Sequence, residues 1–255
     1  MTGTPASPGP ETAAKPLVAG FIYPDHAAED DYPLAEKLLG GNVALPVEHI
    51  YGTDLHAVAE LLDLGSPERL AEGAALLAPH NPASVVWACT SGSFVYGWEG
   101  AAEQVDKLSA AAGGLPASST SFAFVRAAAA LGLRKVAVAA SYPDDVSTLF
   151  VEFLGRGGVE VLSMSAADID TAAEVGELAP EAVVDLIVSR DHRDADAVLV
   201  PDTAMRTLSL IDSIEQRLGK PVLTANQVTV WEGLRLAGAI PRVQGLGALF
   251  HQEGA

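Results

Sequence analysis

The only cysteine of the chain, Cys89, directly follows an apolar run with the character of a buried β-strand. The run is Val85–Ala88, and the small residues Thr90–Ser93 come next. Open α/β sheets bind ligands at the carboxyl ends of their strands, where the N–H groups of a following helix can hold an anion. A cysteine thiolate is a nucleophile and a base. Cys89 is therefore the first candidate for a catalytic residue, and a buried structural cysteine is the alternative.

A second run with the same layout lies in the other half of the chain. Ala197–Val200 is apolar, Pro201 follows, and Asp202 then stands where the thiol stood, with Thr203 after it. A thiol and a carboxylate on opposite faces of a substrate suit proton transfer at a carbon next to a carboxylate. Asp202 has a simpler alternative role, because aspartate is a preferred N-cap residue before a helix.

The charge of the chain limits its partners. Its 255 residues carry a formal net charge of −18 at pH 7. Such a chain does not neutralise nucleic-acid phosphates or bind anionic membrane surfaces, so neither partner is predicted. No run of 18 apolar residues predicts a membrane span, and residues 1–15 lack the features of a signal peptide. A single cysteine fits a cytoplasmic protein without an intramolecular disulfide.

No motif predicts a metal or a cofactor. The six histidines show no metal-ligand spacing, and phosphate-binding glycine loops, dinucleotide fingerprints and serine elbows are missing. His26 is followed by Glu29, Asp30 and Asp31, which we interpret as a solvated acidic loop rather than a cation site.

Short apolar runs alternate with helical patterns, which predicts βαβ units and parallel sheets. The expected strands are Leu17–Tyr23, Asn42–His49, Ser84–Ala88, Lys135–Ala139, Val159–Ser163, Ala197–Val200 and Pro221–Leu223. The expected helices are Asp31–Leu39, Pro67–Leu77, Glu99–Ala112, Ser121–Leu131, Asp144–Arg156, Ala179–Ser189, Thr207–Leu218 and Val228–Ala237.

The two halves of the chain resemble each other. Leu17–Asp25 is similar to Val136–Asp144, the Cys89 and Asp202 runs correspond, and Gly114–Ser119 parallels Gly219–Thr224. Matches in the same order indicate an internal duplication, with chance similarity between βα units as the alternative. The prediction is an α/β fold of two pseudo-symmetric, doubly wound lobes with parallel sheets and the active site in the cleft between them.

The predicted boundaries follow from this duplication. Residues 1–15 form a disordered tail, 16–120 the N-terminal lobe and 121–240 the C-terminal lobe. Residues 241–255 either return to the first lobe or form a tail.

Three segments also carry a resemblance to a known family. Trp87–Ser93 resembles the first cysteine motif of maleate cis-trans isomerases, within the aspartate/glutamate racemase superfamily that includes arylmalonate decarboxylases and hydantoin racemases. Lys220–Gln227, followed by Trp231, resembles a late segment of those proteins, and Ser141–Pro143 resembles the turn that opens their second half. The resemblance covers residues 17–240.

This resemblance implies a cofactor-independent enzyme of two α/β lobes, often a homo-oligomer. In the isomerases two cysteines flank the substrate, and one adds to the alkene carbon while the other moves a proton. Here the first maps to Cys89, and the position of the second falls on Asp202. The early turn Tyr23–Ala27 departs from the Ser/Asn-rich turn that contacts substrate in the family, which leaves the substrate open.

The remaining site candidates are groups that hydrogen-bond to a carboxylate or an enolate. Tyr142 offers a phenol, with an aromatic lid on the core as its alternative role. The expected substrate-binding residues, each with a turn or cap as the alternative, are Tyr23, Thr90, Ser91, Gly92, Thr203 and Asn226.

The predicted function is a cofactor-independent isomerase acting on a small carboxylic or dicarboxylic acid. In one form the Cys89 thiolate adds to an alkene, giving an enolate held by N–H groups and Tyr142. In the other form Cys89 and Asp202 exchange an α-proton across opposite faces. A decarboxylase resembling arylmalonate decarboxylase and a catalytically inactive small-acid-binding protein are the alternatives.

Overall fold

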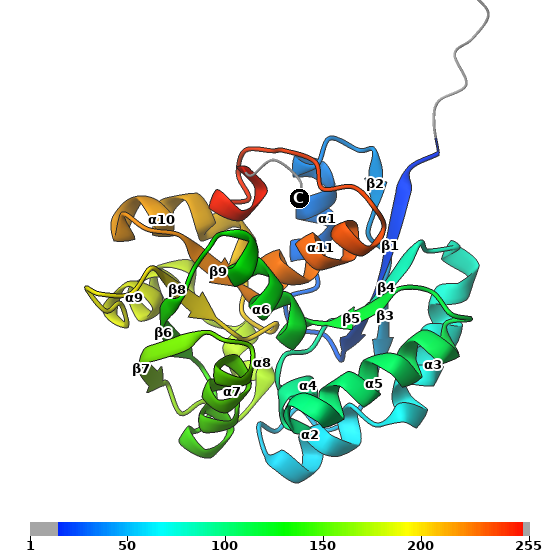
Figure 1. Cartoon of the computed structure of the whole chain (residues 1–255), viewed down its shortest axis with the longest axis horizontal. Coiled ribbons are helices and arrows are strands. Elements are labelled where there is room, and N and C mark those ends of the chain that lie inside the picture. The colour runs from blue at the N-terminus through cyan, green and yellow to red at the C-terminus, as the bar shows by residue number, and fades with distance from the viewer. Residues whose placement is uncertain (1–14, 252–255) are drawn as a thin grey trace, which may run out of the picture.

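The computed structural model describes residues 15–251, which form two parallel β-sheets lying side by side (Figure 1). The first sheet has the order β2-β1-β4-β5, with β3 also pairing with β1, and the second has the order β7-β6-β8-β9. Every strand pair in both sheets is parallel. The predicted α/β fold of two lobes is confirmed.

The strands are β1 (Leu17–Pro24), β2 (Val43–Ala44), β3 (Val47–Ile50), β4 (Ser84–Trp87), β5 (Ala117–Ser119), β6 (Lys135–Ala140), β7 (Glu160–Ala166), β8 (Ala197–Val200) and β9 (Val222–Thr224). The α-helices are α1 (Asp31–Leu38), α2 (Val58–Leu64), α3 (Pro67–Leu77), α4 (Ser91–Phe94), α5 (Gly97–Ala111), α6 (Thr120–Ala130), α7 (Asp144–Arg156), α8 (Ala172–Gly176), α9 (Pro180–Ser189), α10 (Ile211–Leu218) and α11 (Ala225–Leu236). Short 3₁₀ turns cover Ala78–His80, Leu208–Leu210 and Ala248–His251.

The expected single strand Asn42–His49 is wrong, because the chain forms β2 and β3 with a break between them. Pro46 lies in the break and has no N–H to donate. The N–H of Leu45 donates to the Glu36 carboxylate at 2.6 Å instead of to a strand. The sequence reasoning also missed β5, since Ala117–Ser119 is short and polar and carries no apolar run.

Two expected helices begin elsewhere. The residues before Ile211 form a 3₁₀ turn, so α10 is shorter than the expected Thr207–Leu218. Helix α11 begins at Ala225 because Thr224 and Gln227 form a reciprocal capping box. The short helices α2, α4 and α8 were not expected.

The last helix after each sheet packs against the other half of the molecule. Helix α11 covers one face of the first sheet, where the Ser84 hydroxyl donates to the Gly233 carbonyl at 2.7 Å. Helix α6 packs against α11 and reaches α7, with the rings of Phe124 and Phe150 5.4 Å apart. The predicted lobe 121–240 thus shares its core with the first lobe, and nearly all of α11 is buried.

The C-terminal segment returns to the body of the molecule. Leu246, Leu249 and Phe250 are buried, and the Gln227 side chain donates to the Leu246 carbonyl at 2.9 Å. The predicted tail lies outside the described residues except for Lys15, and so do residues 252–255.

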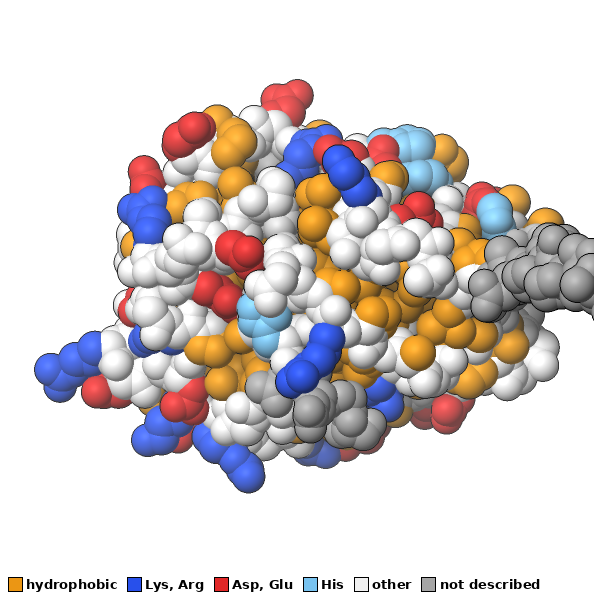
Figure 2. Space-filling view, turned by 90° about the horizontal axis from the view of Figure 1, so that it is seen from above, with side chains coloured by type: hydrophobic (Ala, Val, Ile, Leu, Met, Phe, Trp, Pro, Cys, Tyr) orange, Lys and Arg blue, Asp and Glu red, His pale blue; other side chains and the backbone are white. Residues whose placement is uncertain are grey.

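Acidic and basic side chains are interspersed on the face seen in Figure 2, with no continuous basic patch on that face. Among the described helices, none combines the length and the apolar character needed to cross a membrane.

Candidate active site

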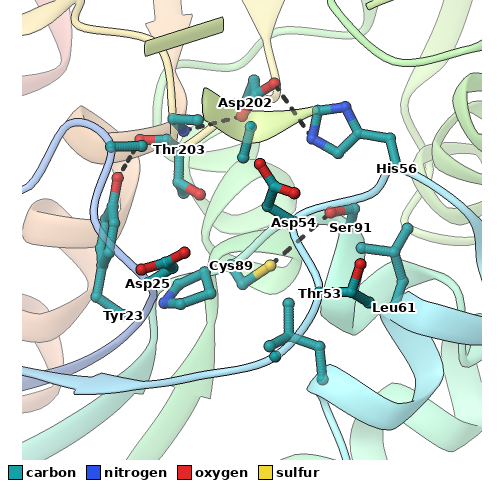
Figure 3. Close-up of a pocket in the computed structure, with 16 residues that line it drawn as sticks. Tyr23, Asp25, Thr53, Asp54, His56, Leu61, Cys89, Ser91, Asp202 and Thr203 are labelled. Atoms are coloured by element: carbon teal, nitrogen blue, oxygen red, sulfur yellow. Dashed lines mark hydrogen bonds and ion pairs between the residues drawn. The ribbon is translucent and has the colours of Figure 1, made fainter. Parts of the chain in front are cut away.

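A pocket lies where the carboxyl ends of β1 and β4 meet the carboxyl end of β8 (Figure 3). Its empty space is about 490 Å³, counting the part open to solvent. The first lobe contributes Tyr23, Pro24, Asp25, Ala27, Gly52, Thr53, Asp54, His56, Leu61, Leu64, Cys89 and Ser91, and the second contributes Ala172, Asp202, Thr203 and Ala204. Cys89 and Asp202 therefore reach one pocket from different sheets.

The thiol of Cys89 is buried, with only 4% of the residue exposed. Its Sγ accepts the Gly92 N–H at 3.3 Å and lies 3.8 Å from the Ser91 hydroxyl oxygen. Burial raises the pKa of Cys89 to about 11, and the nearby Asp202 carboxylate adds to this, while Gly92 and Ser91 lower it. Burial outweighs the expected stabilisation of a thiolate by the turn, so Cys89 carries its proton at neutral pH.

The turn that follows Cys89 is held rigidly. The Gly92 carbonyl accepts from the indole N–H of Trp87 at 3.2 Å and from the Gln104 amide at 2.8 Å. The same amide donates to the Gly65 carbonyl at 2.7 Å. A Cβ on Gly92 would lie 3.1 Å from the sulfur, so glycine permits the close approach of its backbone to the thiol.

The carboxylate of Asp202 is 3% exposed and uses both oxygens. Oδ1 accepts the N–H of Ala204 at 2.8 Å, and Oδ2 accepts the hydroxyl of Ser141 from the end of β6. The Ala204 bond closes a turn two residues long rather than capping a helix, since the next helical turn begins at Leu208. Asp202 is thus fixed with one oxygen toward the pocket side occupied by His56 (Figure 3).

His56 is a site residue that the sequence reasoning missed. Its Nδ1 lies 3.0 Å from the Ile169 carbonyl, which only accepts, so Nδ1 carries the hydrogen. The other ring nitrogen, Nε2, faces Oδ2 of Asp202 at 3.9 Å and has no hydrogen in the neutral ring. The His56 backbone N–H also bonds to the Asp170 carbonyl at 2.8 Å, which ties this loop to the second lobe. The sequence offered no signal beyond the residue type.

Tyr23 and Thr203 meet across the pocket wall. The Tyr23 hydroxyl donates to the Thr203 carbonyl at 2.6 Å and accepts the Ala28 N–H at 3.1 Å. The Asn226 amide donates to the same Thr203 carbonyl at 3.1 Å and to Asp31 at 3.0 Å. Asn226 is fully buried behind the pocket, where it positions the Thr203 turn.

Tyr142 also lies behind the pocket wall. Its hydroxyl donates to the Pro201 carbonyl, next to Asp202, and its ring packs edge-on against His56 at 4.9 Å. Thr90 is fully buried, with its carbonyl accepting the Ser121 hydroxyl at 2.8 Å. Five of the predicted site residues line the pocket, namely Cys89, Asp202, Ser91, Tyr23 and Thr203, and the other four, Thr90, Gly92, Tyr142 and Asn226, lie outside its lining.

The described lining is acidic. Asp25, Asp54 and Asp202 contribute carboxylates, no lysine or arginine is among the described lining residues, and His56 is the one basic side chain there. The field in the pocket thus opposes a second negative charge on a bound ligand.

The family model for arylmalonate decarboxylase matches residues 60–250. The arylmalonate decarboxylase of Bordetella bronchiseptica is 31% identical over 143 residues, which is 55% of this chain and 60% of that protein. The maleate isomerase of Geobacillus stearothermophilus is 28% identical over 138 residues, which is 54% of this chain and 55% of that protein. The aligned segments thus span little more than half the length of these relatives.

Solved structures share the whole architecture. A liganded double variant of arylmalonate decarboxylase superimposes with a TM-score of 0.82 at 26% identity, covering 94% of this chain and 100% of that one. The maleate isomerase of Pseudomonas putida S16 superimposes with a TM-score of 0.83 at 23% identity, covering 92% of this chain and 98% of that one. At this identity the likeness shows the fold alone. The resemblance seen in Trp87–Ser93 is confirmed, and the chain belongs to the arylmalonate decarboxylase and maleate isomerase family of the aspartate/glutamate racemase superfamily.

Proposed function

We propose that this protein is a cofactor-independent isomerase that transfers a proton at the carbon next to the carboxylate of a small organic acid. The observation that carries the proposal is the pairing of two groups in one buried pocket. Cys89 enters from the first lobe as a protonated thiol, and Asp202 enters from the second beside His56. An acid and a base on different walls of one pocket are what exchange of an α-proton requires.

In this mechanism the Asp202 carboxylate removes the α-proton and leaves an enolate-type intermediate. The Cys89 thiol then gives its proton to the opposite face of the same carbon, so that Asp202 ends protonated and Cys89 ends as the thiolate. The reverse reaction restores both groups from the other isomer. His56 Nε2 lies 3.9 Å from Oδ2 of Asp202, so the two groups would have to approach each other before a proton could pass between them.

The raised pKa of Cys89 favours proton transfer over covalent addition. Addition to an alkene needs the thiolate, whereas protonation of an enolate needs the thiol. A bound anion would raise the pKa of the thiol further, because like charges disfavour ionisation. For this chain we therefore favour the two-base mechanism over covalent addition.

The acidic lining favours a substrate with a single carboxylate. Asp25, Asp54 and Asp202 repel a dianion, and His56 alone offers a compensating charge.

Decarboxylation is the second candidate, and the protonated thiol also favours it. Loss of carbon dioxide from a malonate leaves an enediolate that takes one proton, and Cys89 carries one at neutral pH. The 31% identity to an arylmalonate decarboxylase supports this candidate as well.

A substrate panel in deuterated water separates these reactions. The panel holds chiral 2-substituted monocarboxylates, aspartate, glutamate, hydantoins, maleate and malonates, with NMR detection of α-deuterium and a parallel assay for carbon dioxide. We expect racemisation of a monocarboxylate with deuterium entering at the α-carbon, and we expect both Cys89→Ala and Asp202→Asn to abolish the racemisation because inversion needs both groups. Asp185→Asn, at an exposed carboxylate, is the matched control.

Three results would overturn the proposal. Carbon dioxide release from a malonate that depends on Cys89 would establish the decarboxylase instead. A substrate adduct on Cys89, detected by mass spectrometry, would establish covalent addition. Binding of acids without exchange, release or adduct would leave a binding protein.

A further inference from the structure

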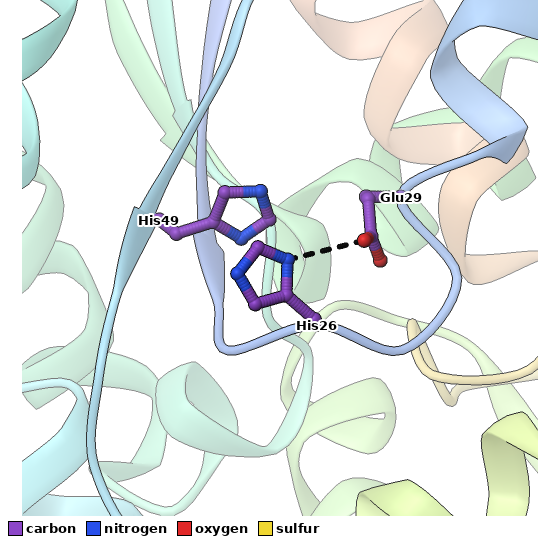
Figure 4. A group of neighbouring side chains, drawn as sticks. All are labelled: His26, Glu29 and His49. Atoms are coloured by element: carbon purple, nitrogen blue, oxygen red, sulfur yellow. Dashed lines mark hydrogen bonds and ion pairs between the residues drawn. The ribbon is translucent and has the colours of Figure 1, made fainter.

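We propose that His26, Glu29 and His49 bind a transition-metal dication such as Zn²⁺ at the rim of the pocket. This side-chain cluster is formed by segments distant in the sequence (Figure 4). His26 and Glu29 lie in the loop after β1, and His49 lies in β3. The register that pairs Tyr23 of β1 with His49 brings the two segments together.

The spacing of the three side chains fits a small cation. One ligand atom from each lies within 4.8 Å of the others, and His26 Nδ1 is 3.1 Å from Glu29 Oε1. Two ligands bound to tetrahedral zinc at about 2.0–2.1 Å lie roughly 3.3 Å apart, so a cation could replace the proton of this hydrogen bond with little movement. His26 would then carry its hydrogen on Nε2, which lies 3.0 Å from the Tyr51 hydroxyl oxygen. Two imidazole nitrogens and one carboxylate are a ligand set that zinc accepts, leaving a fourth position for water.

The hydrogen bond of His49 prepares it for coordination. Its Nδ1 contacts the backbone carbonyl of Asp25, which only accepts, so Nδ1 carries the hydrogen. Nε2 is then unprotonated in the neutral ring and available to a metal. Metal-binding histidines commonly donate their other N–H to a carbonyl in this way, which fixes the ring.

Glu29 offers an unused oxygen. Its Oε2 is buried and has no hydrogen-bond partner among the described residues, while Oε1 is engaged by His26. A carboxyl group with an unpartnered buried oxygen is a group that a bound cation would complete.

The cluster is connected to the pocket through Asp25. This residue precedes His26, lines the pocket, and gives its carbonyl to His49 with its backbone in the left-handed region at φ 48°. A bound dication would fix this turn and place positive charge beside an acidic pocket. We therefore expect an anionic substrate to bind more tightly when the metal is present. This effect on substrate rests on the proposed function, whereas the binding of the metal itself does not depend on it.

Calorimetric titration of the EDTA-treated full chain with ZnCl₂ tests metal binding directly. We expect one saturable site, with affinity falling at least about tenfold in His26→Ala, His49→Ala and Glu29→Gln. Cobalt titration adds a spectroscopic readout, because tetrahedral Co²⁺ absorbs strongly in the visible range. Circular dichroism of each variant confirms that it is folded.

His80→Ala is the matched control, since His80 pairs with Glu48 at 2.8 Å on the surface and has no second histidine among its hydrogen-bond or ion-pair partners. Its zinc affinity should equal that of the wild type, as should that of Cys89→Ser. Saturable zinc binding that survives all three cluster substitutions would overturn the proposal. So would absence of binding at millimolar zinc, or an equal loss in His80→Ala. None of these results depends on the enzymatic reaction.

Discussion

Nε2 of His56 lies 3.9 Å from Oδ2 of Asp202, and both side chains are almost completely buried. His56 comes from the loop before α2 in the first lobe, whereas Asp202 follows β8 in the second. A buried carboxylate is costly unless it is paired or hydrogen-bonded, and here the Ser141 hydroxyl and the Ala204 N–H hydrogen-bond to it. The pair therefore joins the two halves at the position where the proposed base acts.

Substitution of His56 should slow turnover more than it weakens substrate binding. In His56→Gln the carboxylate of Asp202 loses the imidazole beside it in the buried pocket, so we expect kcat to fall by about 10- to 100-fold. KM should change little, because His56 is expected to act on the proton-transfer step rather than on substrate binding. Steady-state kinetics on the substrate found in the panel measure both effects.

The control for this substitution is His80→Gln on the surface, which should leave kcat unchanged. A His56→Gln variant that is folded and has the kcat of the wild type would show that Asp202 acts without the imidazole.

Alkylation of Cys89 should be slow at neutral pH. With a pKa near 11, only about one thiol in a thousand is ionised at pH 8, so the rate should rise about tenfold per pH unit from 7 to 10. Asp202→Asn removes a like charge and should lower the pKa of Cys89, which speeds alkylation at pH 8. Iodoacetamide kinetics followed by mass spectrometry give both results.

Asp185→Asn, outside the pocket lining and in an exposed ion pair with Arg217, should alter neither rate nor pH dependence. A rate that levels off near pH 8.5 in the wild type would mean that the N–H groups of the turn stabilise the thiolate more than burial destabilises it.

The strand-end motifs could be predicted because they are local. An apolar run that is followed by Cys89 or Asp202 predicts the strand and places the polar residue at its carboxyl end, where parallel sheets bind ligands. The same reasoning fails where a partner is distant in sequence. His56 meets Asp202 only because Ile169 and Asp170 hold its loop, and no local pattern predicts that contact.

The direction in which a polar side chain points could not be predicted from the sequence either. Tyr142 and Asn226 are polar residues at expected turns, yet their donors point to the carbonyls of Pro201 and Thr203. Residue type and spacing place such a side chain near a site but do not tell which backbone group it will satisfy. The break between β2 and β3 at the edge of the first sheet was not predicted for a related reason. At this break the N–H of Leu45 bonds to the Glu36 side chain instead of to a strand.

Asp31 should make stability depend on pH. Burial raises the pKa of Asp31 to about 6, although Asn226 and the Thr207 N–H lower it by hydrogen bonding. The unfolded carboxyl titrates near 3.9, so the folded state holds the proton more tightly. The resulting stabilisation is complete below about pH 4 and is lost as the pH rises through 6, with an upper size of about 3 kcal/mol.

Asp31→Asn should remove this dependence. Chemical unfolding of both proteins between pH 4 and 8 gives the difference in free energy of unfolding, which should grow in favour of the variant as the pH rises. A constant difference over this range would show that Asp31 titrates at its ordinary value. Asp196→Asn is an informative contrast, because N–H groups lower the pKa of that exposed carboxyl.

The glycine at position 65 should be required for the geometry of the thiol. A Cβ there would lie 2.1 Å from the Gly92 carbonyl oxygen and 2.6 Å from the Gln104 amide nitrogen. Gly65→Ala must therefore push away the turn that donates to the sulfur, at a cost of about 1–3 kcal/mol in the free energy of unfolding. We expect a lower Tm, and faster alkylation of Cys89 because its burial is relaxed.

Gly155→Ala provides the matched control, since Gly155 lies in helix α7 and a Cβ there meets nothing within 4 Å. Alanine should raise stability at that position by about 0.5–1 kcal/mol, because it restricts the unfolded chain and favours the helix. If Gly65→Ala were as stable as Gly155→Ala and its thiol reacted at the wild-type rate, the turn after Cys89 would tolerate displacement. The raised pKa of the thiol would then owe less to the tight contact between Gly65 and Gly92.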